Sequence, residues 1–234
     1  MSETTVSLVI QGETLVLHPE RALIWPRRHT VIVADTHFGK SSHFGRHGIA
    51  VPAGTDEADR HRLTQLVTEF GARRLIILGD FLHAPLTDGT PEADALQQWA
   101  EQLAMFLEIH VVAGNHDLHA SRLPPLQWWE SQWIDPPFCF IHDANRGRFT
   151  GADSLFTVSG HVHPVIRLRS LGRSTLRIPI FWQKTAGLIL PSFGQFTGGF
   201  AITPGKGDRI FGVAPNAIVP FQNPRIRSPR HGSS

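Results

Sequence analysis

The feature that most constrains this chain is a set of short apolar runs, each ending in a loop that carries Asp, Asn or His. One run, residues 109–113, reads as a buried strand and leads directly into Gly114, Asn115, His116 and Asp117. Open α/β sheets bind ligands on loops just past the carboxyl ends of strands. Asn115 offers an amide oxygen and His116 a proton near neutral pH. This loop is therefore a candidate chemical site.

Other apolar runs end in loops of matching chemistry. The polar residues that follow them are Asp35 and His37 after residues 30–34, Asp80 after residues 75–78, His142 after residues 138–141, and His161 and His163 after residues 155–159. Asp35 and His37 lie two positions apart, so on a continuing strand their side chains leave on one face and converge on one ion. With 14 His and a single Cys, the composition favours imidazole and carboxylate metal sites over thiolate sites.

Helical patterns separate the first apolar runs. Residues 56–70 have helical spacing, with Thr55 available as N-cap and Gly71 as terminator. A second helix begins at Thr90 and Pro91, a favourable cap followed by proline in the first turn. The order strand, helix, strand, helix, strand predicts a parallel sheet and an α/β fold.

The flanking regions have different patterns. Residues 6–10 and 14–17 predict a hairpin, and residues 22–25 a third short strand. Residues 123–138, rich in Pro and Trp, predict an irregular cap or a short helix whose tryptophans serve as anchors rather than base-stacking platforms. The β-like segments after His163 predict a largely antiparallel second sheet; they are residues 175–180, 187–190, 199–203 and 209–213.

The length of 234 residues suits one large domain, which we expect over residues 1–218. Residues 219–234, rich in Pro and Arg, are expected to form a flexible tail that is either a nonspecific nucleic-acid arm or simply disordered. No apolar run approaches a membrane span and residues 1–5 do not open a signal peptide, so we expect a soluble, cytoplasmic protein. Cys139, inside an apolar run, is expected to be inert core.

Taken in order over residues 30–203, these motifs resemble those of the calcineurin-like metallophosphoesterases. The resemblance implies a four-layer α/β/β/α sandwich with two divalent metals at the edge shared by the two sheets. It implies one metal on Asp35, His37, Asp80 and His163, and the other on Asp80, Asn115, His142 and His161. Asp80 would bridge the two ions, which would share a hydroxide for in-line attack on phosphorus. His116 would protonate the leaving oxygen.

Any one of these residues has a structural explanation; for example, Asp35 can cap a turn and His142 can be a core histidine. Chance at every motif together is far less plausible. Two departures from the family pattern stand out. His83 occupies the position where phosphatase relatives have an Asp that orients the catalytic histidine, and Asp117 is a possible substitute for it. His142 is followed by Asp143 rather than the frequent Gly.

The loop over residues 38–48 leaves the first metal motif and carries several cationic residues. We expect Lys40 and Arg46 to bind substrate phosphate, with His83 as a further substrate contact. His43 and His47 are expected to be ordinary surface residues.

A narrower resemblance rests on this loop, residues 79–83, residues 160–164 and residues 190–199. These resemble the bacterial ligase-associated DNA-damage-response metallophosphoesterases, in which His83 is no anomaly. That group implies a manganese-dependent phosphodiesterase or DNA endonuclease, with iron or zinc as alternative metals, and a functional association with a DNA ligase, an exonuclease and a helicase.

Charge and composition leave rivals open. The pI of about 9.2 and the preference for Arg over Lys permit a nucleic-acid substrate without requiring one. The rivals are a small-molecule phosphodiesterase or pyrophosphatase, a phosphomonoesterase, and a non-catalytic scaffold such as the retromer subunit that shares this fold. The intact set of proposed ligands together with His116 argues against the scaffold.

Overall fold

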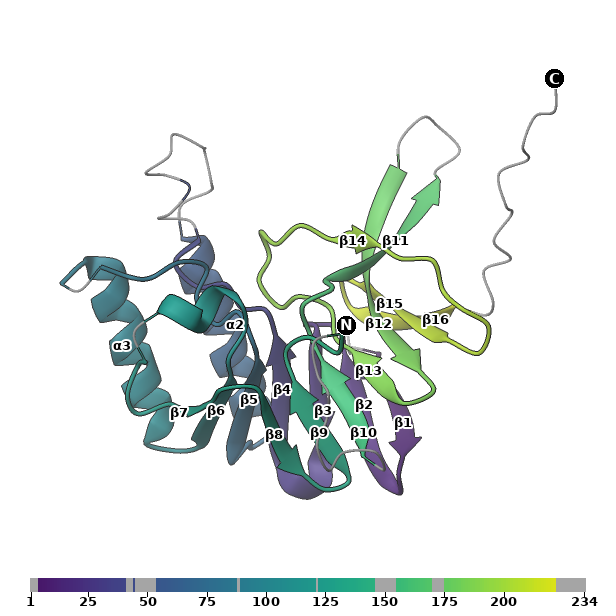
Figure 1. Ribbon diagram of the computed structural model, residues 1–234, viewed down its shortest axis with the longest axis horizontal. Coiled ribbons are helices and arrows are strands. Elements are labelled where there is room, and N and C mark those ends of the chain that lie inside the picture. The colour runs from purple at the N-terminus through teal and green to yellow at the C-terminus, as the bar shows by residue number, and fades with distance from the viewer. Residues whose placement is uncertain are drawn as a thin grey trace.

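The computed structural model describes residues 4–40, 44, 54–87, 89–120, 122–145, 155–169 and 175–221. Two β-sheets pack face to face in this part of the chain, and two α-helices lie side by side against one of them (Figure 1). The predicted mixed α/β sandwich is therefore confirmed. The fourth layer of the expected α/β/β/α sandwich, a helical layer on the outer face of the second sheet, is not present within the described ranges.

The first sheet has the order β1-β2-β3-β4-β5-β6-β7. Its strands are β1 (Val6–Ile10), β2 (Glu13–His18), β3 (Ala22–Trp25), β4 (Thr30–Ala34), β5 (Arg74–Leu78), β6 (Glu108–Val112) and β7 (Gln127–Trp129). The first four pair antiparallel, and β4 to β7 pair parallel. The predicted hairpin and parallel sheet are both confirmed. β4 is buried along its whole length, as expected for a parallel strand covered on both faces.

The two helices, α2 (Thr55–Glu69) and α3 (Pro91–Ala104), pack on one face of this sheet through a shared apolar core. The Thr90 side chain accepts a hydrogen bond from the Ala93 N–H at 3.3 Å, which is the predicted cap. The prediction for Thr55 is wrong. The N-cap is Gly54 at φ +81°, so α2 begins one residue earlier and Thr55 is its first helical residue.

The second sheet runs β14-β11-β12-β13-β10-β9-β8, with β15 pairing β12 and β16 pairing β15. Its strands are β8 (Gln132–Asp135), β9 (Phe138–Ile141), β10 (Phe156–Ser159), β11 (Pro164–Arg169), β12 (Thr175–Lys184), β13 (Gly187–Ile189), β14 (Phe200–Ala201), β15 (Arg209–Ala214) and β16 (Ala217–Phe221). Most pairs are antiparallel, as predicted. The parallel pairs are those of β10 with β9 and β13 at the centre, and that of β11 with β14 at the edge.

Two expectations about segments need correction. Residues 123–138 do not form a helix or an irregular cap, because β7 extends the first sheet and β8 extends the second. These short segments become strands because they pair with β6 and β9, and local propensity does not reveal such distant partners. The expected boundary before residue 219 falls inside β16, and residues 222–234 lie outside the described residues.

The core between the sheets is lined by aromatic and aliphatic side chains such as Trp25, Phe138, Phe140 and Phe181. Cys139 is also buried, and burial raises the pKa of its thiol, in keeping with the predicted inert core role. Among the described residues, no helix has both the length and the apolar character needed to span a bilayer.

Candidate metal centre

The predicted site residues meet at one edge shared by the two sheets. The carboxyl ends of β4, β5 and β6 lie in register in the first sheet, and those of β9 and β10 in the second. Main-chain hydrogen bonds tie the loops that follow: Asp35 N–H donates to the Gly79 carbonyl at 3.2 Å, and Gly160 N–H to the His142 carbonyl at 3.0 Å. Phe193 N–H donates to the Ala34 carbonyl at 2.8 Å and thereby joins the two sheets. The loops therefore form one connected platform.

The backbone of this platform is unusual. The non-glycine residues there with φ in the left-handed region are Asp35 (54°), His37 (49°), Asp80 (45°), His161 (67°) and His163 (46°). Such conformations cost free energy and persist where the surrounding structure holds them, often at functional sites. Here they turn each side chain out of its strand and toward the shared edge.

Close packing beneath the platform requires glycine. Gly79 has φ +71°, and a Cβ at that position would lie 2.0 Å from Nδ1 of His142. Any side chain at residue 79 would therefore displace the His142 ring. The glycine before Asp80 is part of the site because it makes room for a histidine from the other sheet.

The first cluster comprises Asp35, His37 and His163, whose donor atoms lie within 4.8 Å of one another. Nε2 of His163 is 3.4 Å from Oδ1 of Asp35 and 3.5 Å from Nε2 of His37. Asp35 is fully buried, and its carboxylate accepts the His161 main-chain N–H at 3.0 Å. The structure thus brings together three of the four residues expected at one metal.

The second cluster comprises Asp80, His142 and His161, again within 4.8 Å, and Asn115 joins it. Nε2 of His142 lies 3.1 Å from Oδ1 of Asn115, 3.0 Å from Nδ1 of His161 and 3.5 Å from Oδ2 of Asp80. The same Asp80 oxygen is 3.9 Å from Nε2 of His37 in the first cluster. Asp80 therefore reaches both groups, as the bridging role requires.

The far ring nitrogens of His142 and His163 are held by main-chain carbonyls. Nδ1 of His142 donates to the Leu78 carbonyl at 3.3 Å, and Nδ1 of His163 to the Gly198 carbonyl at 3.1 Å. Each bond sets the tautomer, so in the neutral ring the Nε2 lone pair faces the cluster.

This arrangement fits a pair of cations. A neutral His142 presents a lone pair to the amide oxygen of Asn115 and the carboxylate of Asp80, which are also acceptors. Acceptors that converge without a donor are stabilised by a cation placed between them. Imidazole and carboxylate together suit divalent first-row metals. The donor set thus matches two divalent ions.

Burial and charge set the protonation of the first cluster. Burial, and then the neighbouring His163 and Lys40, lower the pKa of His37 to about 2, so His37 stays neutral and able to bind a metal. Burial also disfavours the charged form of His163, but the adjacent Asp35 carboxylate outweighs it and the pKa of His163 is raised.

His116 lies beside the clusters, exposed, on a 3-10 turn over His116–His119. Its Nδ1 donates to the His83 carbonyl at 2.8 Å, and its ring stacks on that of His83 with centroids 5.2 Å apart. Its ring centroid is 5.3 Å from that of His37. His83 thus positions His116 through a main-chain oxygen and a ring face, which explains how the site does without the usual Asp.

The substitute role suggested for Asp117 is wrong. Asp117 is fully buried, and its carboxylate accepts main-chain N–H groups from Gly114, Phe81 and Leu82 at 2.9, 3.1 and 3.0 Å. Those bonds fasten the loop after β6 to the loop after β5. Asp117 therefore supports the platform and does not contact the His116 ring.

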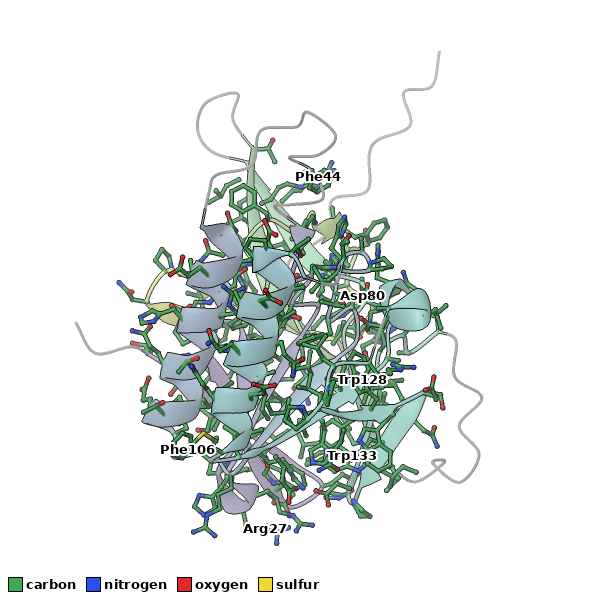
Figure 2. All side chains as sticks on the ribbon, turned by 90° about the vertical axis from the view of Figure 1, so that its left-hand side faces the viewer. Arg27, Phe44, Asp80, Phe106, Trp128 and Trp133 are labelled. Carbon is green, nitrogen blue, oxygen red and sulfur yellow. The ribbon has the colours of Figure 1, made fainter. Side chains whose placement is uncertain are left out.

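Lys40 lies half-buried next to the first cluster, and burial lowers its pKa. Its ammonium group is 5.7 Å from the Phe44 ring centroid, and Phe44 in turn is 5.4 Å from the His83 ring. In Figure 2 Phe44 lies above Asp80, whereas Trp128 and Trp133 lie below it. Arg46, His43 and His47 lie outside the described residues.

The tryptophans of residues 123–138 are partly buried and pack against the two main apolar cores. Trp128 lies against Phe81 with ring centroids 5.8 Å apart, and Trp133 stacks on His110 at 4.2 Å. This packing agrees with the predicted anchoring role.

Sequence reasoning missed several functional features. Asp143, noted as a departure from the family pattern, has its carboxylate 3.6 Å from Nε2 of His161 and so helps to hold that ring. The orienting carbonyls of Leu78, His83 and Gly198 carry no sequence signal, because every residue has one.

The fold and the two clusters define a class of protein. The family model for calcineurin-like phosphoesterases matches residues 28–205, so the chain belongs to that family and is a metal-dependent phosphoesterase. Among solved structures, the crystal structure of the nuclease MPE from Pseudomonas putida is similar, with 32% identity and a TM-score of 0.75. The alignment covers 93% of this chain and 100% of that one. No curated protein sequence matches the chain.

Proposed function

We propose that the protein is a dinuclear phosphodiesterase that cleaves DNA as an endonuclease, with manganese as its metal. The observation that carries the proposal is the position of Asp80 Oδ2 between the two clusters, 3.5 Å from His142 Nε2 and 3.9 Å from His37 Nε2. The similarity to the Pseudomonas putida nuclease supports a nucleic-acid substrate. The proposed metal ligands are Asp35, His37, Asp80, Asn115, His142, His161 and His163.

A pair of bound divalent ions would supply a hydroxide nucleophile near neutral pH and stabilise charge on the phosphoryl oxygens. Asp35 and Asp80 provide the compensating negative charge, and main-chain N–H groups of His161 and His116 hold their carboxylates in place. His116 acts as general acid. Its Nδ1–H stays bonded to the His83 carbonyl, so the proton that passes to the leaving oxygen must come from Nε2 of the doubly protonated imidazolium ring, which leaves the neutral Nδ1–H tautomer behind.

We further propose that the protein acts in DNA repair in the cytoplasm, in functional association with a DNA ligase, an exonuclease and a helicase. The motif resemblance over residues 38–48, 79–83, 160–164 and 190–199 supports this setting. Lys40, Arg46 and His83 are the proposed substrate contacts.

One preparation tests the reaction class. Manganese-dependent turnover is measured on a nitrophenyl phosphodiester, the matching phosphomonoester and circular single-stranded DNA, with Asp80→Asn as the inactive control. The proposal predicts diester cleavage and nicking of the circle. Diester turnover without nicking excludes the nuclease function and leaves a small-molecule phosphodiesterase. Faster turnover of the phosphomonoester than of either diester excludes both the nuclease and the small-molecule phosphodiesterase and indicates a phosphomonoesterase.

A further inference from the structure

A pocket of about 280 Å³ opens beside the first cluster and shares His163 with it. Its walls come from β11, β12 and the loop over residues 192–199, and two arginines, Arg21 and Arg177, line it. Of the residues that sequence analysis assigned to substrate binding, Lys40 and His83 do not line this pocket, and Arg46 lies outside the described residues.

Arg21 is held in place by main-chain oxygens rather than by a carboxylate. One guanidinium nitrogen donates to the carbonyls of Ser192 and Gly194 at 3.2 and 3.5 Å. The nearest acidic residues are already engaged, because Arg62 pairs with Glu20 at 3.0 Å and with Asp59 at 3.4 Å. Within the described part of the chain, Arg21 has no ion-pair partner.

Arg177 reaches the pocket from the opposite wall. It is exposed, and one of its guanidinium nitrogens donates to the Gly199 carbonyl at 2.9 Å. Across the described ranges it too lacks an ion-pair partner. The pocket is therefore lined by two guanidinium groups that have no direct carboxylate partner among the described residues, although Asp59 and Glu20 act on Arg21 from a longer range.

The loop over residues 192–199 links these arginines to the metal ligands. The Ser192 hydroxyl donates to the Asp35 carbonyl at 3.0 Å, and the Gly198 carbonyl accepts from Nδ1 of His163. Carbonyls of one loop thus orient the first cluster and both guanidinium groups. An anion in the pocket would lie next to the reacting phosphate.

We propose that this pocket is a subsite for the phosphate group adjacent to the scissile phosphodiester of a polynucleotide. The inference rests on the proposed phosphodiesterase function. Guanidinium groups match phosphate oxygens with paired hydrogen bonds, and each arginine has N–H groups beyond the one used to bond the loop. The subsite would favour nucleic acid over simple diesters, which have one phosphate.

The test compares substrates with and without a neighbouring phosphate. Wild type, Arg21→Gln and Arg177→Gln are assayed on bis(4-nitrophenyl) phosphate, on a thymidine dinucleotide, and on that dinucleotide bearing an added 5′- or 3′-phosphate. Each variant is expected to lose about tenfold in kcat/KM on one phosphorylated dinucleotide, the scale of a lost charge-assisted hydrogen bond. Turnover of bis(4-nitrophenyl) phosphate should stay near wild type. Arg209→Gln, outside the pocket and bonded to Gln183, is the matched control.

Several outcomes would overturn the subsite. Equal losses on all substrates in both variants would mean that the arginines only support the loop, and unchanged kcat/KM on both phosphorylated dinucleotides would mean that the pocket binds no phosphate. Fluorescence anisotropy with labelled 5′- and 3′-phosphorylated trinucleotides in EDTA tests the pocket apart from turnover. Weaker binding by both variants supports the subsite even if no diester is hydrolysed, whereas unchanged affinity contradicts it. If the wild-type enzyme hydrolyses none of the diesters, the proposed phosphodiesterase function is contradicted, and the anisotropy measurement still decides whether the pocket binds phosphate.

Discussion

Asp135 lies between two arginines near the amino ends of β4 and β5. Asp35 and Asp80 follow the carboxyl ends of the same strands. Their ion-pair partners among the described residues are all histidines. Arg28 and Arg74 contact the two Asp135 oxygens at 2.8 and 2.7 Å. At both ends of these strands, buried carboxylates are held by specific contacts. At the amino end the partners are guanidinium groups, which are always charged, and at the carboxyl end they are imidazole rings.

At the amino end the Asp135 carboxylate is neutralised within the protein by the two guanidinium groups. Arg74 also lies over the Trp133 ring at 5.0 Å, so its guanidinium combines an ion pair with a cation–π contact. At the carboxyl end, two carboxylates and several imidazoles converge without an arginine or lysine partner in the described chain. Removing the carboxylate between two arginines costs stability, whereas carboxylates and imidazoles without a cationic partner are suited to hold metal ions.

The largest expected effect is on activity at the carboxyl end. Asp80→Asn should reduce phosphodiester turnover to background, because Oδ2 of Asp80 faces a ring Nε2 in each cluster, that of His37 and that of His142. Substituting a residue that only supports a metal ligand typically lowers metal affinity or activity by about 10–100-fold, and substituting a bridging ligand should lower activity further. Activity is measured per folded molecule beside Asp135→Asn, which should stay near wild type. If His37→Ala is as inactive as Asp80→Asn, and Asp80→Asn still binds two metals per chain, then Asp80 does not bridge the two ions.

Next in size is the loss of the proposed acid. His116→Ala should slow cleavage of a dinucleotide by about 10²–10⁴, since its sugar alkoxide leaves poorly without a proton. Nitrophenoxide leaves without one, so a nitrophenyl diester should be affected far less. Asn115→Ala should slow both substrates alike, because it weakens metal binding. If His116→Ala keeps its metals and slows both substrates equally, its role is positioning rather than proton transfer.

At the amino end the effect should appear as stability. Asp135→Asn leaves two arginines close together without a carboxylate and should lower the free energy of unfolding by about 3 kcal/mol, at the lower end for a broken buried pair. Urea unfolding of the metal-free protein measures this change. Asp80→Asn is the comparison and should destabilise the metal-free protein less. A larger loss of stability in Asp80→Asn than in Asp135→Asn would contradict the assignment of Asp135 to stability and of Asp80 to metal binding.

The smallest expected effect concerns Lys40. Lys40→Ala should weaken binding to single-stranded DNA modestly and reduce the slope of log affinity against log salt by about one. Lys184→Ala, whose ammonium group lies over Trp182 at 4.8 Å, is the control and should leave the slope unchanged. An unaltered salt series for Lys40→Ala would assign Lys40 to the solvated surface.

The sequence predicted much of this arrangement because its signals are local. β4, β5 and β6 are mainly apolar runs, and the polar residues after each run mark the sheet edge where the structure brings them together. Thr90 and Pro91 likewise mark the start of α3 by chemistry within one turn.

What the sequence did not reveal depends on partners distant along the chain. β7 and β8 form because β6 and β9 present strand edges with which they pair. Gly54 rather than Thr55 is the N-cap of α2, in a left-handed conformation that the residue types did not indicate. His83 acts through its carbonyl, and Arg21 meets Ser192 and Gly194 only in the folded chain. Residue type alone predicts none of these contacts.

The most direct measurement is the number and coupling of manganese ions bound to the wild-type chain. Equilibrium dialysis with Mn²⁺ counts the ions, and electron paramagnetic resonance reports whether they interact through a shared ligand. We expect two ions per chain with a spin-coupled signal, and loss of the coupling in Asp80→Asn. A wild-type enzyme that hydrolyses phosphodiesters with a single bound ion, or with two uncoupled ions, would contradict a dinuclear centre bridged by Asp80.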